Sequence, residues 1–229
     1  MRDLPFEPIR RALVIAPHPD DEVLGCGGTI ARLARAGTEI VVAILTRAQP
    51  PLFEESVSRI GRAEAATAHA KLGVARTLFR DLPAARLDEV PHYELNRTLI
   101  ELLLEVAPDT LFVPHLGDIH LDHQRAFASS LMAARPNRPG YPTRIFAYET
   151  LSETNWNAPG ITPNFAPNLF VDISDVLELK LEAMAAYVSQ RRDFPHERSF
   201  EAIRALAMLR GSTVFRRGAE AFMLLRQVI

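Results

Sequence analysis

Short apolar runs alternate with longer segments of helical periodicity through most of this chain. The strand-length runs occupy residues 12–16, 39–45, 77–79, 110–114 and 144–148. The helical patterns lie between them, at residues 27–36, 55–72, 93–106 and 122–134. Parallel strands joined by helices are connected by right-handed crossovers, which leaves few alternative topologies. The alternation therefore predicts an α/β fold with a doubly wound, mostly parallel sheet and helices on both faces.

The last third of the chain departs from this regular alternation. Residues 155–167 contain three prolines and one glycine, which predicts a long ordered loop or a lid, and such loops are often functional. We expect a strand over residues 169–173 and a helix over residues 175–190 with Ser174 as its N-cap. A helix is expected over residues 200–209. Residues 221–228 fit either a helix or a strand.

Length and charge limit the classes of partner. With 229 residues, 48% of them hydrophobic, the chain can bury one large core, and we expect residues 1–229 to form a single domain. The net charge is -2 and no long run of like charge occurs. Neither nucleic acid nor an anionic membrane is therefore an expected partner, and small solutes fit better. The pattern leaves the oligomeric state open, a homo-oligomer included.

The expected location is the cytoplasm. The N-terminal stretch MRDLPFEPIRR is charged and lacks the apolar segment of a signal peptide. No later apolar stretch approaches the roughly 18 to 20 residues of a membrane span, so we expect no stable membrane insertion. The single cysteine, Cys26, cannot form an internal disulfide, which fits a reducing compartment.

A polar turn follows the first strand at residues 17–22, which read Pro-His-Pro-Asp-Asp-Glu. Consecutive carboxylates repel one another, and each needs water or a positive partner, so this turn is typical of a cation site rather than of packing. His18 and Asp21 are three residues apart and can hold one cation together. Asp20 lies between them and can face a bound water instead.

A second polar turn follows the fourth strand at residues 117–123, which read Gly-Asp-Ile-His-Leu-Asp-His. In the common doubly wound strand order the first and fourth strands are neighbours, and ligands bind at their carboxyl ends. We therefore expect His120 and His123 to lie beside His18 and Asp21.

Two imidazoles and one carboxylate leave coordination positions open, as in a catalytic zinc site, and the same set also suits Fe(II). Zn²⁺ lowers the pKa of a bound water toward about 7, and Asp20 is placed to accept the proton as general base. His120 is expected to stabilise the oxyanion or to protonate the departing amine. Asp122 is expected to bond the far nitrogen of His120, and Asp118 or Glu22 to support a ligand imidazole. The predicted reaction is hydrolysis of an amide.

The two turns together resemble the paired signature of the N-acetylglucosaminyl deacetylase family, relatives of the phosphatidylinositol-glycan deacetylase and of the bacterial LmbE-like proteins. The resemblance extends to Glu64, to residues 72–74, 170–174 and 187–190, and to residues 219–222, so that it spans essentially the whole chain. It implies a zinc-dependent N-deacetylase on a Rossmann-like sheet. The implied ligands are His18, Asp21 and His123. The implied base is Asp20, assisted by His120.

The implied substrate is an amino sugar. Residues 148–156 and the Arg210-Gly211 segment resemble bacterial members linked to cell-surface glycan biosynthesis, which suggests a sugar nucleotide, a lipid-linked sugar or a free amino sugar. The chain departs from the family pattern at residues 46–49, which read Thr-Arg-Ala-Gln where many members have Asp-Gly. It also has Leu121 where a proline is usual.

Other interpretations of these residues remain. Residues 25–28, Gly-Cys-Gly-Gly, could form the loop of an NAD(P)-binding oxidoreductase, but Ile30 stands at the third glycine position and the adjacent carboxylates would repel a pyrophosphate. A non-catalytic sugar-binding descendant is a third alternative. Arg62 is a candidate for contacting substrate phosphate or hydroxyl groups, although a solvated helix face also explains it. His69 is expected to be an exposed or capping helix residue.

Overall fold

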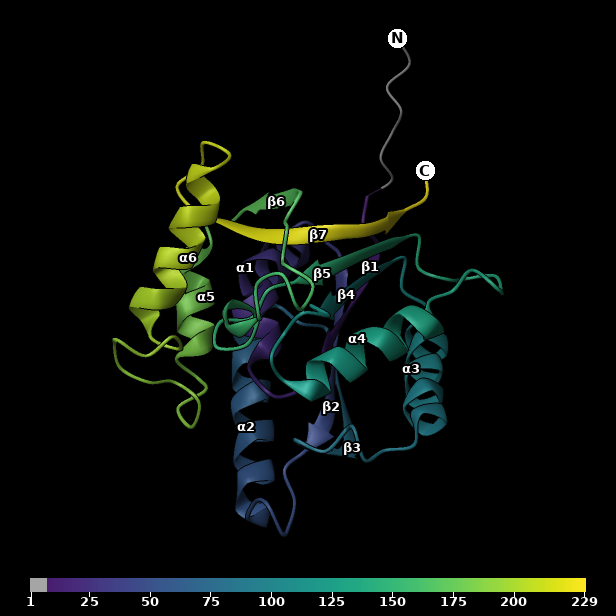
Figure 1. The fold of residues 1–229 in the computed structure, drawn as a ribbon. Coiled ribbons are helices and arrows are strands. Elements are labelled where there is room, and N and C mark those ends of the chain that lie inside the picture. The colour runs from purple at the N-terminus through teal and green to yellow at the C-terminus, as the bar shows by residue number, and fades with distance from the viewer. Residues whose placement is uncertain (1–7) are drawn as a thin grey trace.

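The computed structural model describes residues 8–229. Seven strands of this part of the chain form one sheet in the order β3-β2-β1-β4-β5-β7-β6 (Figure 1). The parallel strands are β1 (Arg11–Ala16), β2 (Glu39–Arg47), β3 (Arg76–Pro83), β4 (Thr110–Pro114) and β5 (Arg144–Tyr148). The strand β7 (Ala219–Gln227) runs antiparallel to both of its neighbours, β5 and β6 (Leu169–Asp172). The predicted doubly wound, mostly parallel α/β fold is confirmed.

Helices cover both faces of the sheet, as Figure 1 shows. On one face α1 (Asp21–Arg35), α2 (Glu55–Leu72) and α5 (Leu177–Met184) contact one another, and α6 (Phe200–Ser212) contacts α5 and β7. On the other face α3 (His92–Val106) packs against α4 (Leu121–Ala133). A short 3₁₀ turn, η1, spans Thr154–Trp156.

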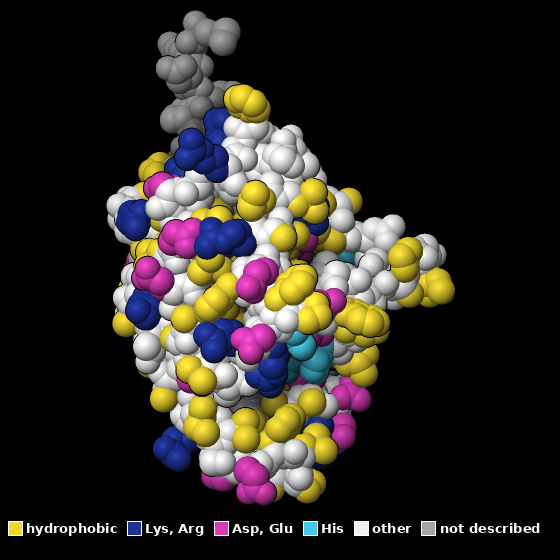
Figure 2. All heavy atoms as spheres, turned by 90° about the vertical axis from the view of Figure 1, so that its left-hand side faces the viewer, with side chains coloured by type: hydrophobic (Ala, Val, Ile, Leu, Met, Phe, Trp, Pro, Cys, Tyr) yellow, Lys and Arg dark blue, Asp and Glu magenta, His cyan; other side chains and the backbone are white. Residues whose placement is uncertain are grey.

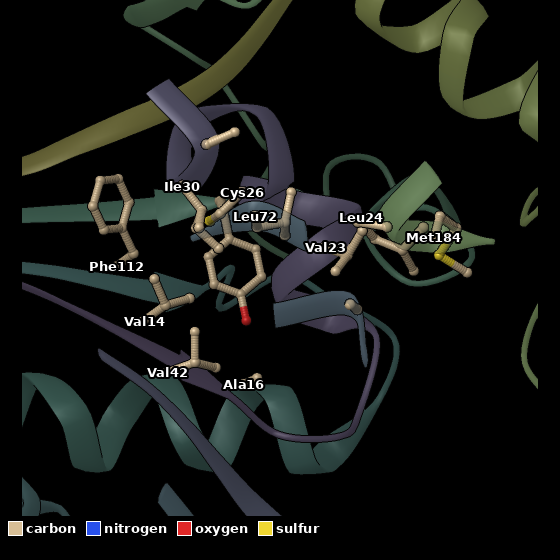
Figure 3. Close-up of a cluster of buried hydrophobic side chains, with 14 of the residues drawn as sticks. Val14, Ala16, Val23, Leu24, Cys26, Ile30, Val42, Leu72, Phe112 and Met184 are labelled. Carbon is tan, nitrogen blue, oxygen red and sulfur yellow. The ribbon is translucent and has the colours of Figure 1, made fainter. Parts of the chain in front are cut away.

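The pleat of the strands divides the core into two layers. Successive side chains of a strand point to opposite faces, so Val14 and Val42 pack under α1 and α2, whereas Ile15 and Val41 pack under α3 and α4. Figure 3 shows part of the first layer, with Val14 and Val42 beside Ile30 of α1. The central strands are apolar on both faces because both faces are covered by helices.

Several predicted boundaries differ from the structure. The first helix begins at Asp21 rather than at residue 27, because two acidic residues in its first turn suit the positive end of the helix dipole. The helix predicted over residues 175–190 is shorter, Leu177–Met184, and its N-cap is Val176 rather than Ser174. The third strand is longer than residues 77–79, and the C-terminal segment is the strand β7.

The sheet order places the two polar turns next to each other. β1 pairs directly with β4, in the register Ala12↔Thr110 to Val14↔Phe112. Both strands run in the same direction, so the turns that follow them leave the same edge of the sheet. The predicted meeting of the two turns is confirmed.

Two expectations concern the membrane and the N-terminus. Within residues 8–229 no helix is both long and apolar enough to cross a lipid bilayer. Residues 1–7, which form most of the stretch in which no signal peptide is expected, lie outside the described residues.

A buried ion pair fixes the middle of α1. The carboxylate of Glu220 accepts the backbone N–H groups of Gly28 (2.8 Å) and Thr29 (2.7 Å). Lys180 Nζ donates to Glu220 Oε1 at 2.6 Å and to the carbonyl oxygen of Leu24 at 2.8 Å. Both charged side chains are almost completely buried. Because α1 carries Asp21 at its first position, this pair ties the helix of the first polar turn to β7 and α5.

Replacing one partner of this pair should destabilise the protein strongly. We expect Glu220→Gln to lower the free energy of unfolding by about 3–5 kcal/mol, since the Lys180 ammonium stays buried without a counterion. Urea denaturation followed by circular dichroism measures the change. The control is Glu178→Gln, which removes an exposed pair with Arg204 and should leave the denaturation midpoint unchanged. A loss below about 1 kcal/mol for Glu220→Gln would contradict the assignment.

Candidate active site

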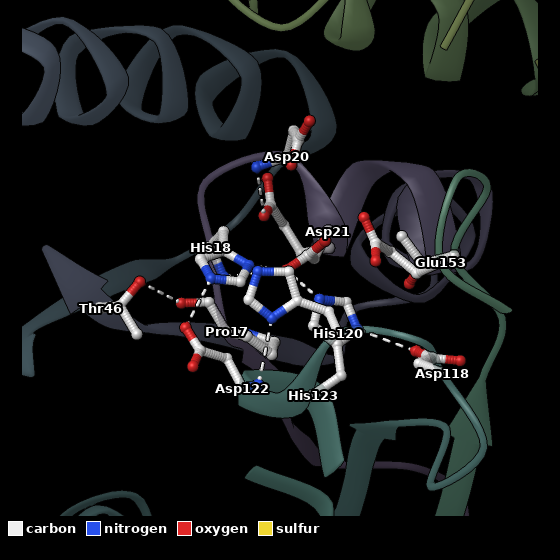
Figure 4. A network of polar contacts seen from close by, with 12 residues as sticks. Pro17, His18, Asp20, Asp21, Thr46, Asp118, His120, Asp122, His123 and Glu153 are labelled. Carbon is white, nitrogen blue, oxygen red and sulfur yellow. Dashed lines mark hydrogen bonds and ion pairs between the residues drawn. The ribbon is translucent and has the colours of Figure 1, made fainter. Parts of the chain in front are cut away.

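Three side chains from the two polar turns converge at the carboxyl ends of β1 and β4. The Asp21 Oδ2 atom lies 3.3 Å from His18 Nδ1 and 3.2 Å from His123 Nε2. One ligand atom from each of these three residues lies within 4.8 Å of the other two. Figure 4 shows the imidazoles and the carboxylate grouped between the ends of the strands. Residues more than 100 positions apart in the chain are therefore neighbours.

The hydrogen bonds of the two imidazoles fit a divalent cation. His123 Nδ1 bonds Asp118 Oδ2 at 2.8 Å, and His18 Nε2 bonds Asp122 Oδ2 at 2.9 Å. The opposite nitrogen of each ring faces Asp21. The buried His123 Nε2 makes no hydrogen bond within residues 8–229. A metal-binding histidine characteristically has one ring nitrogen on a carboxylate and the other directed at the ion. The residues present therefore fit such an ion.

The charge balance of the site also favours a cation. Five carboxylates surround the imidazoles of His18 and His123. Within the described residues, the ion pairs of these carboxylates involve those two histidines and one guanidinium, that of Arg198; the five are Asp20, Asp21, Asp118, Asp122 and Glu153. Burial would raise the pKa of Asp21, but His123 and His18 hold it well below its ordinary value. Burial would lower the pKa of His18, yet its bonds to Asp122 and Asp21 raise it to about 9. The site therefore stabilises positive charge.

Asp20 faces the pocket beside these three residues. Its carboxylate is almost fully buried, and Arg198 Nη1 donates to its Oδ2 atom at 3.0 Å. Burial raises the pKa of Asp20 to about 8, and the Arg198 charge opposes that rise. Arg198 also contacts Glu153 Oε1 at 3.4 Å, Gln190 Oε1 at 3.1 Å and Ser152 Oγ at 3.0 Å. The guanidinium therefore joins the Asp20 turn to two loops, residues 149–153 and residues 185–199.

His120 has a defined tautomer. It is the N-cap of α4, and its Nδ1 atom accepts the backbone N–H of Asp122 at 3.1 Å. Nδ1 is thus an acceptor, which leaves the proton on Nε2. Burial and the neighbouring His18 lower the pKa of His120 to about 4, so the ring is neutral at pH 7. A neutral imidazole with a free Nε2–H is a hydrogen-bond donor.

The hydrogen-bond partner predicted for the Asp122 carboxylate is wrong. The carboxylate does not bond the far nitrogen of His120. It accepts from His18 and from the backbone N–H groups of Ala85 (2.7 Å) and Leu87 (2.9 Å). From the second position of α4 its carboxylate points to the turn after β1 and to the loop after β3 rather than toward the N-cap. Asp118 supports His123 as predicted, whereas Glu22 contacts neither ligand imidazole.

A pocket of about 210 Å³ opens beside this cluster. Its polar lining includes His18, Asp20, His120, Glu153, Gln190 and Arg198. Its apolar lining includes Ile44, Phe53, Val57 and Phe79. In Figure 2 histidine side chains are visible in a hollow, next to basic and apolar side chains. Arg62 also lines the pocket, pairs with Asp81 at 2.5 Å and lies 4.9 Å above the Phe79 ring.

The glycines of residues 25–28 serve packing rather than phosphate binding. They lie inside α1, and a Cβ atom on Gly25 would stand 2.2 Å from the Tyr148 ring. A Cβ on Gly28 would stand 2.6 Å from Ile173. A dinucleotide needs its glycines at the open start of a helix. This arrangement speaks against the oxidoreductase alternative.

Sequence reasoning missed or misplaced several residues around the site. Arg198 and Glu153 were not among the predicted site residues, because an isolated arginine or glutamate in a loop carries no motif. His69 is buried, contrary to the prediction of an exposed or capping residue, and its Nε2 atom lies 3.2 Å from Glu22 Oε1. Two small residues of α2, Ala65 and Ala68, stand at helical spacing with His69 and mark a buried helix face. This spacing is the one sequence signal for the burial of His69.

Comparison with known proteins links this site to a family. The family model described as PIG-L, GlcNAc-PI de-N-acetylase, matches residues 13–134, just over half of the chain. The matched range contains both polar turns. The diacetylchitobiose deacetylase of Thermococcus kodakarensis is 29% identical over 227 residues, covering 94% of this chain and 83% of that protein. The 2'-N-acetylparomamine deacetylase of Streptomyces fradiae is 27% identical, covering 80% of this chain and 74% of that protein.

A solved structure shares the architecture. The N,N'-diacetylchitobiose deacetylase from Pyrococcus horikoshii, complexed with an inhibitor, superposes with a TM-score of 0.78 at 27% identity. The superposition covers 98% of this chain and 86% of that one. The likeness thus extends beyond the segment matched by the family model to the C-terminal region that supplies Gln190 and Arg198.

Proposed function

This chain belongs to the PIG-L family of GlcNAc-PI de-N-acetylases, and from that premise we propose that it is a metal-dependent hydrolase that removes the N-acetyl group from an amino sugar of the N-acetylglucosamine type. The observation that carries this proposal is the arrangement of His18 and His123. Each ring has one nitrogen on a carboxylate and the other turned to Asp21. Asp20 and His120 lie beside them at the pocket.

His18, Asp21 and His123 would hold the ion, which we propose to be Zn²⁺, with Fe²⁺ as the alternative. A divalent cation bound there would supply Lewis acidity toward water and toward the acyl oxygen. Asp118 and Asp122 keep the two imidazoles in the tautomer that directs a lone pair at the ion. Asp122 therefore acts through His18 and not as a carrier of the transferred proton.

The proton transfers are assigned to Asp20 and the stabilisation of the oxyanion to His120. Asp20 accepts a proton from the attacking water as general base in its ionised form, which the charge of Arg198 favours and a bound cation would favour further. Arg198 keeps the Asp20 carboxylate directed at the pocket through the 3.0 Å contact. The neutral His120 presents its Nε2–H to the oxygen that becomes negative as the amide carbon turns tetrahedral. The proton taken up by Asp20 passes to the departing amine nitrogen as the C–N bond breaks, so the products are acetate and the free amine of the sugar.

The substrate class follows from the pocket and from the relatives. The pocket volume of about 210 Å³ suits one sugar ring with its acetamido group. The relatives reported above are deacetylases of diacetylchitobiose and of 2'-N-acetylparomamine, two different N-acetylated molecules. We therefore assign the N-acetylated ring to the pocket. The remainder of the substrate, whether carbohydrate, nucleotide or lipid, would extend past Arg62 toward solvent.

Acetate release tests this proposal. Zn²⁺-loaded protein is incubated with N-acetylglucosamine and with N,N'-diacetylchitobiose, and acetate and primary amine are measured in parallel. We expect the two products in equal amounts from at least one sugar. Binding of both sugars without release of acetate would contradict the hydrolase and favour a sugar-binding protein. Thermal stabilisation by NAD(P) but not by Zn²⁺ would favour the oxidoreductase.

A further inference from the structure

Asp20 has an unusual backbone conformation. Its φ of 108° and ψ of -25° lie in the left-handed region, although it is not a glycine. Such a conformation costs on the order of 1–3 kcal/mol and persists only where the surroundings hold it. Asp20 is also the N-cap of α1, and its own side chain does not cap the helix. Its carboxylate is thereby free to turn toward the pocket.

The Glu22 carboxylate holds the backbone of Asp20 through a hydrogen bond. The Asp20 N–H donates to Glu22 Oε2 at 3.2 Å, and the Glu22 side chain is fully buried. The other carboxylate oxygen, Oε1, accepts the Tyr187 hydroxyl at 2.5 Å and lies 3.2 Å from His69 Nε2. The Nδ1 atom of His69 is in turn bonded to Thr77 Oγ1 at 2.7 Å. A buried chain of polar contacts therefore leads from α2 and from the segment after α5 to the amide of Asp20.

The same segment after α5 also reaches the Asp20 carboxylate. Ser189 is tied to Glu64 of α2 through its backbone N–H (2.8 Å) and its hydroxyl (2.6 Å). The next residue, Gln190, accepts from Arg198, which donates to Asp20 Oδ2. Residues 187–190 thus contact Asp20 indirectly at two points, once at its amide and once at its carboxylate.

We propose that Tyr187 and His69 are positioning residues for the general base: they orient Glu22, whose carboxylate fixes the left-handed Asp20 so that its side chain faces the pocket. This inference rests on the proposed function. Neither Tyr187 nor His69 lines the pocket, so they act through Glu22 rather than on substrate.

The metal ligands are held by other contacts. The Asp21 carboxylate accepts the backbone N–H of His18 at 2.8 Å, and His18 is bonded to Asp122. His123 is bonded to Asp118. None of these contacts involves Glu22, Tyr187 or His69. Weakening the buried chain should therefore displace Asp20 while leaving metal binding intact, which separates positioning of the base from general structural damage.

Tyr187→Phe tests the inference, because it deletes one hydroxyl and keeps the ring in the core. We expect kcat for acetate release to fall about 10- to 100-fold, with KM and metal content unchanged. Hydrogen exchange followed by mass spectrometry should show faster exchange at the Asp20 amide. The matched control is Tyr93→Phe, whose exposed hydroxyl contacts Glu94 and which should change none of these quantities. His69→Asn removes the second contact to Glu22 and serves as an independent variant.

A double-mutant cycle decides whether Tyr187 acts through Asp20. In an Asp20→Asn background, Tyr187→Phe should lower kcat by less than twofold, because the base that it positions is already absent. An equal loss in both backgrounds, or a loss of bound metal, would overturn the inference, and so would an unchanged kcat in the single variant. The exchange measurement needs no turnover. Unchanged exchange at Asp20 therefore overturns the positioning role on its own, whereas failure of the wild-type protein to release acetate counts against the proposed function.

Discussion

Asp20→Asn is expected to lower kcat for N-acetyl hydrolysis by about 10²- to 10⁴-fold while the protein keeps its metal ion. The amide has nearly the same shape as the carboxylate, and its oxygen can still accept from Arg198, so the surrounding loops should stay in place. What is lost is the capacity to take a proton from water. Asp20 is not among the residues that would hold the ion, so metal content measured by plasma mass spectrometry should not change.

The control for this substitution is Asp175→Asn. That carboxylate is largely exposed and pairs with Arg32 and Arg35, far from the pocket lining. It should leave both kcat and metal content unchanged. A kcat for Asp20→Asn within twofold of the wild-type value would exclude Asp20 as the base. Loss of the ion from Asp20→Asn would instead assign Asp20 to metal binding.

Removal of the metal is the second large effect. Dialysis against a chelator should reduce kcat at least about a thousand-fold, because Lewis acidity is worth several kcal/mol of barrier. One equivalent of Zn²⁺ should restore activity, and parallel reconstitution with Fe²⁺ decides between the two ions. The thermal midpoint should also fall on chelation, since an ion that binds only the folded state stabilises it by mass action.

Substitution of a ligand should reproduce the effect of chelation. His123→Ala removes the imidazole whose Nε2 atom faces Asp21, and we expect it to hold less than stoichiometric metal and to show no recovery with Zn²⁺. His92→Ala changes an exposed histidine at the start of α3 and is the matched control. Full activity of the chelated protein, with metal absent by mass spectrometry, would exclude a metal-dependent mechanism.

Much of the site could be predicted because its signals are local. The consecutive carboxylates after the first strand are hard to explain by packing, and their charge points to a cation. The second polar turn, residues 117–123, likewise follows the fourth strand. Parallel pairing of β1 with β4 follows from the doubly wound topology, so the convergence of His18 and His123 required no long-range contact information beyond strand order.

The unpredicted parts depend on where long side chains reach. Asp122 contacts His18 instead of His120 because the first turn of α4 directs its carboxylate to the turn that follows β1. Arg198 arrives at Asp20 from the loop before α6, 178 positions away. By its sequence His69 resembles a helix-surface residue, but it is buried because α2 packs against α1, where His69 contacts Glu22. Each of these contacts depends on how a helix or loop packs against the rest of the protein.

The sequence by itself determined the fold class and predicted that the trio of His18, Asp21 and His123 lies together, since periodic burial and repelling charges are properties of short segments. Tertiary structure alone decided which groups surround that trio. It placed Arg198 on Asp20, directed Asp122 to His18 and built the buried chain of polar contacts from His69 and Tyr187 to Asp20. The physical reason is that a hydrogen bond requires atoms about 3 Å apart, and only the packed chain brings distant residues to that separation.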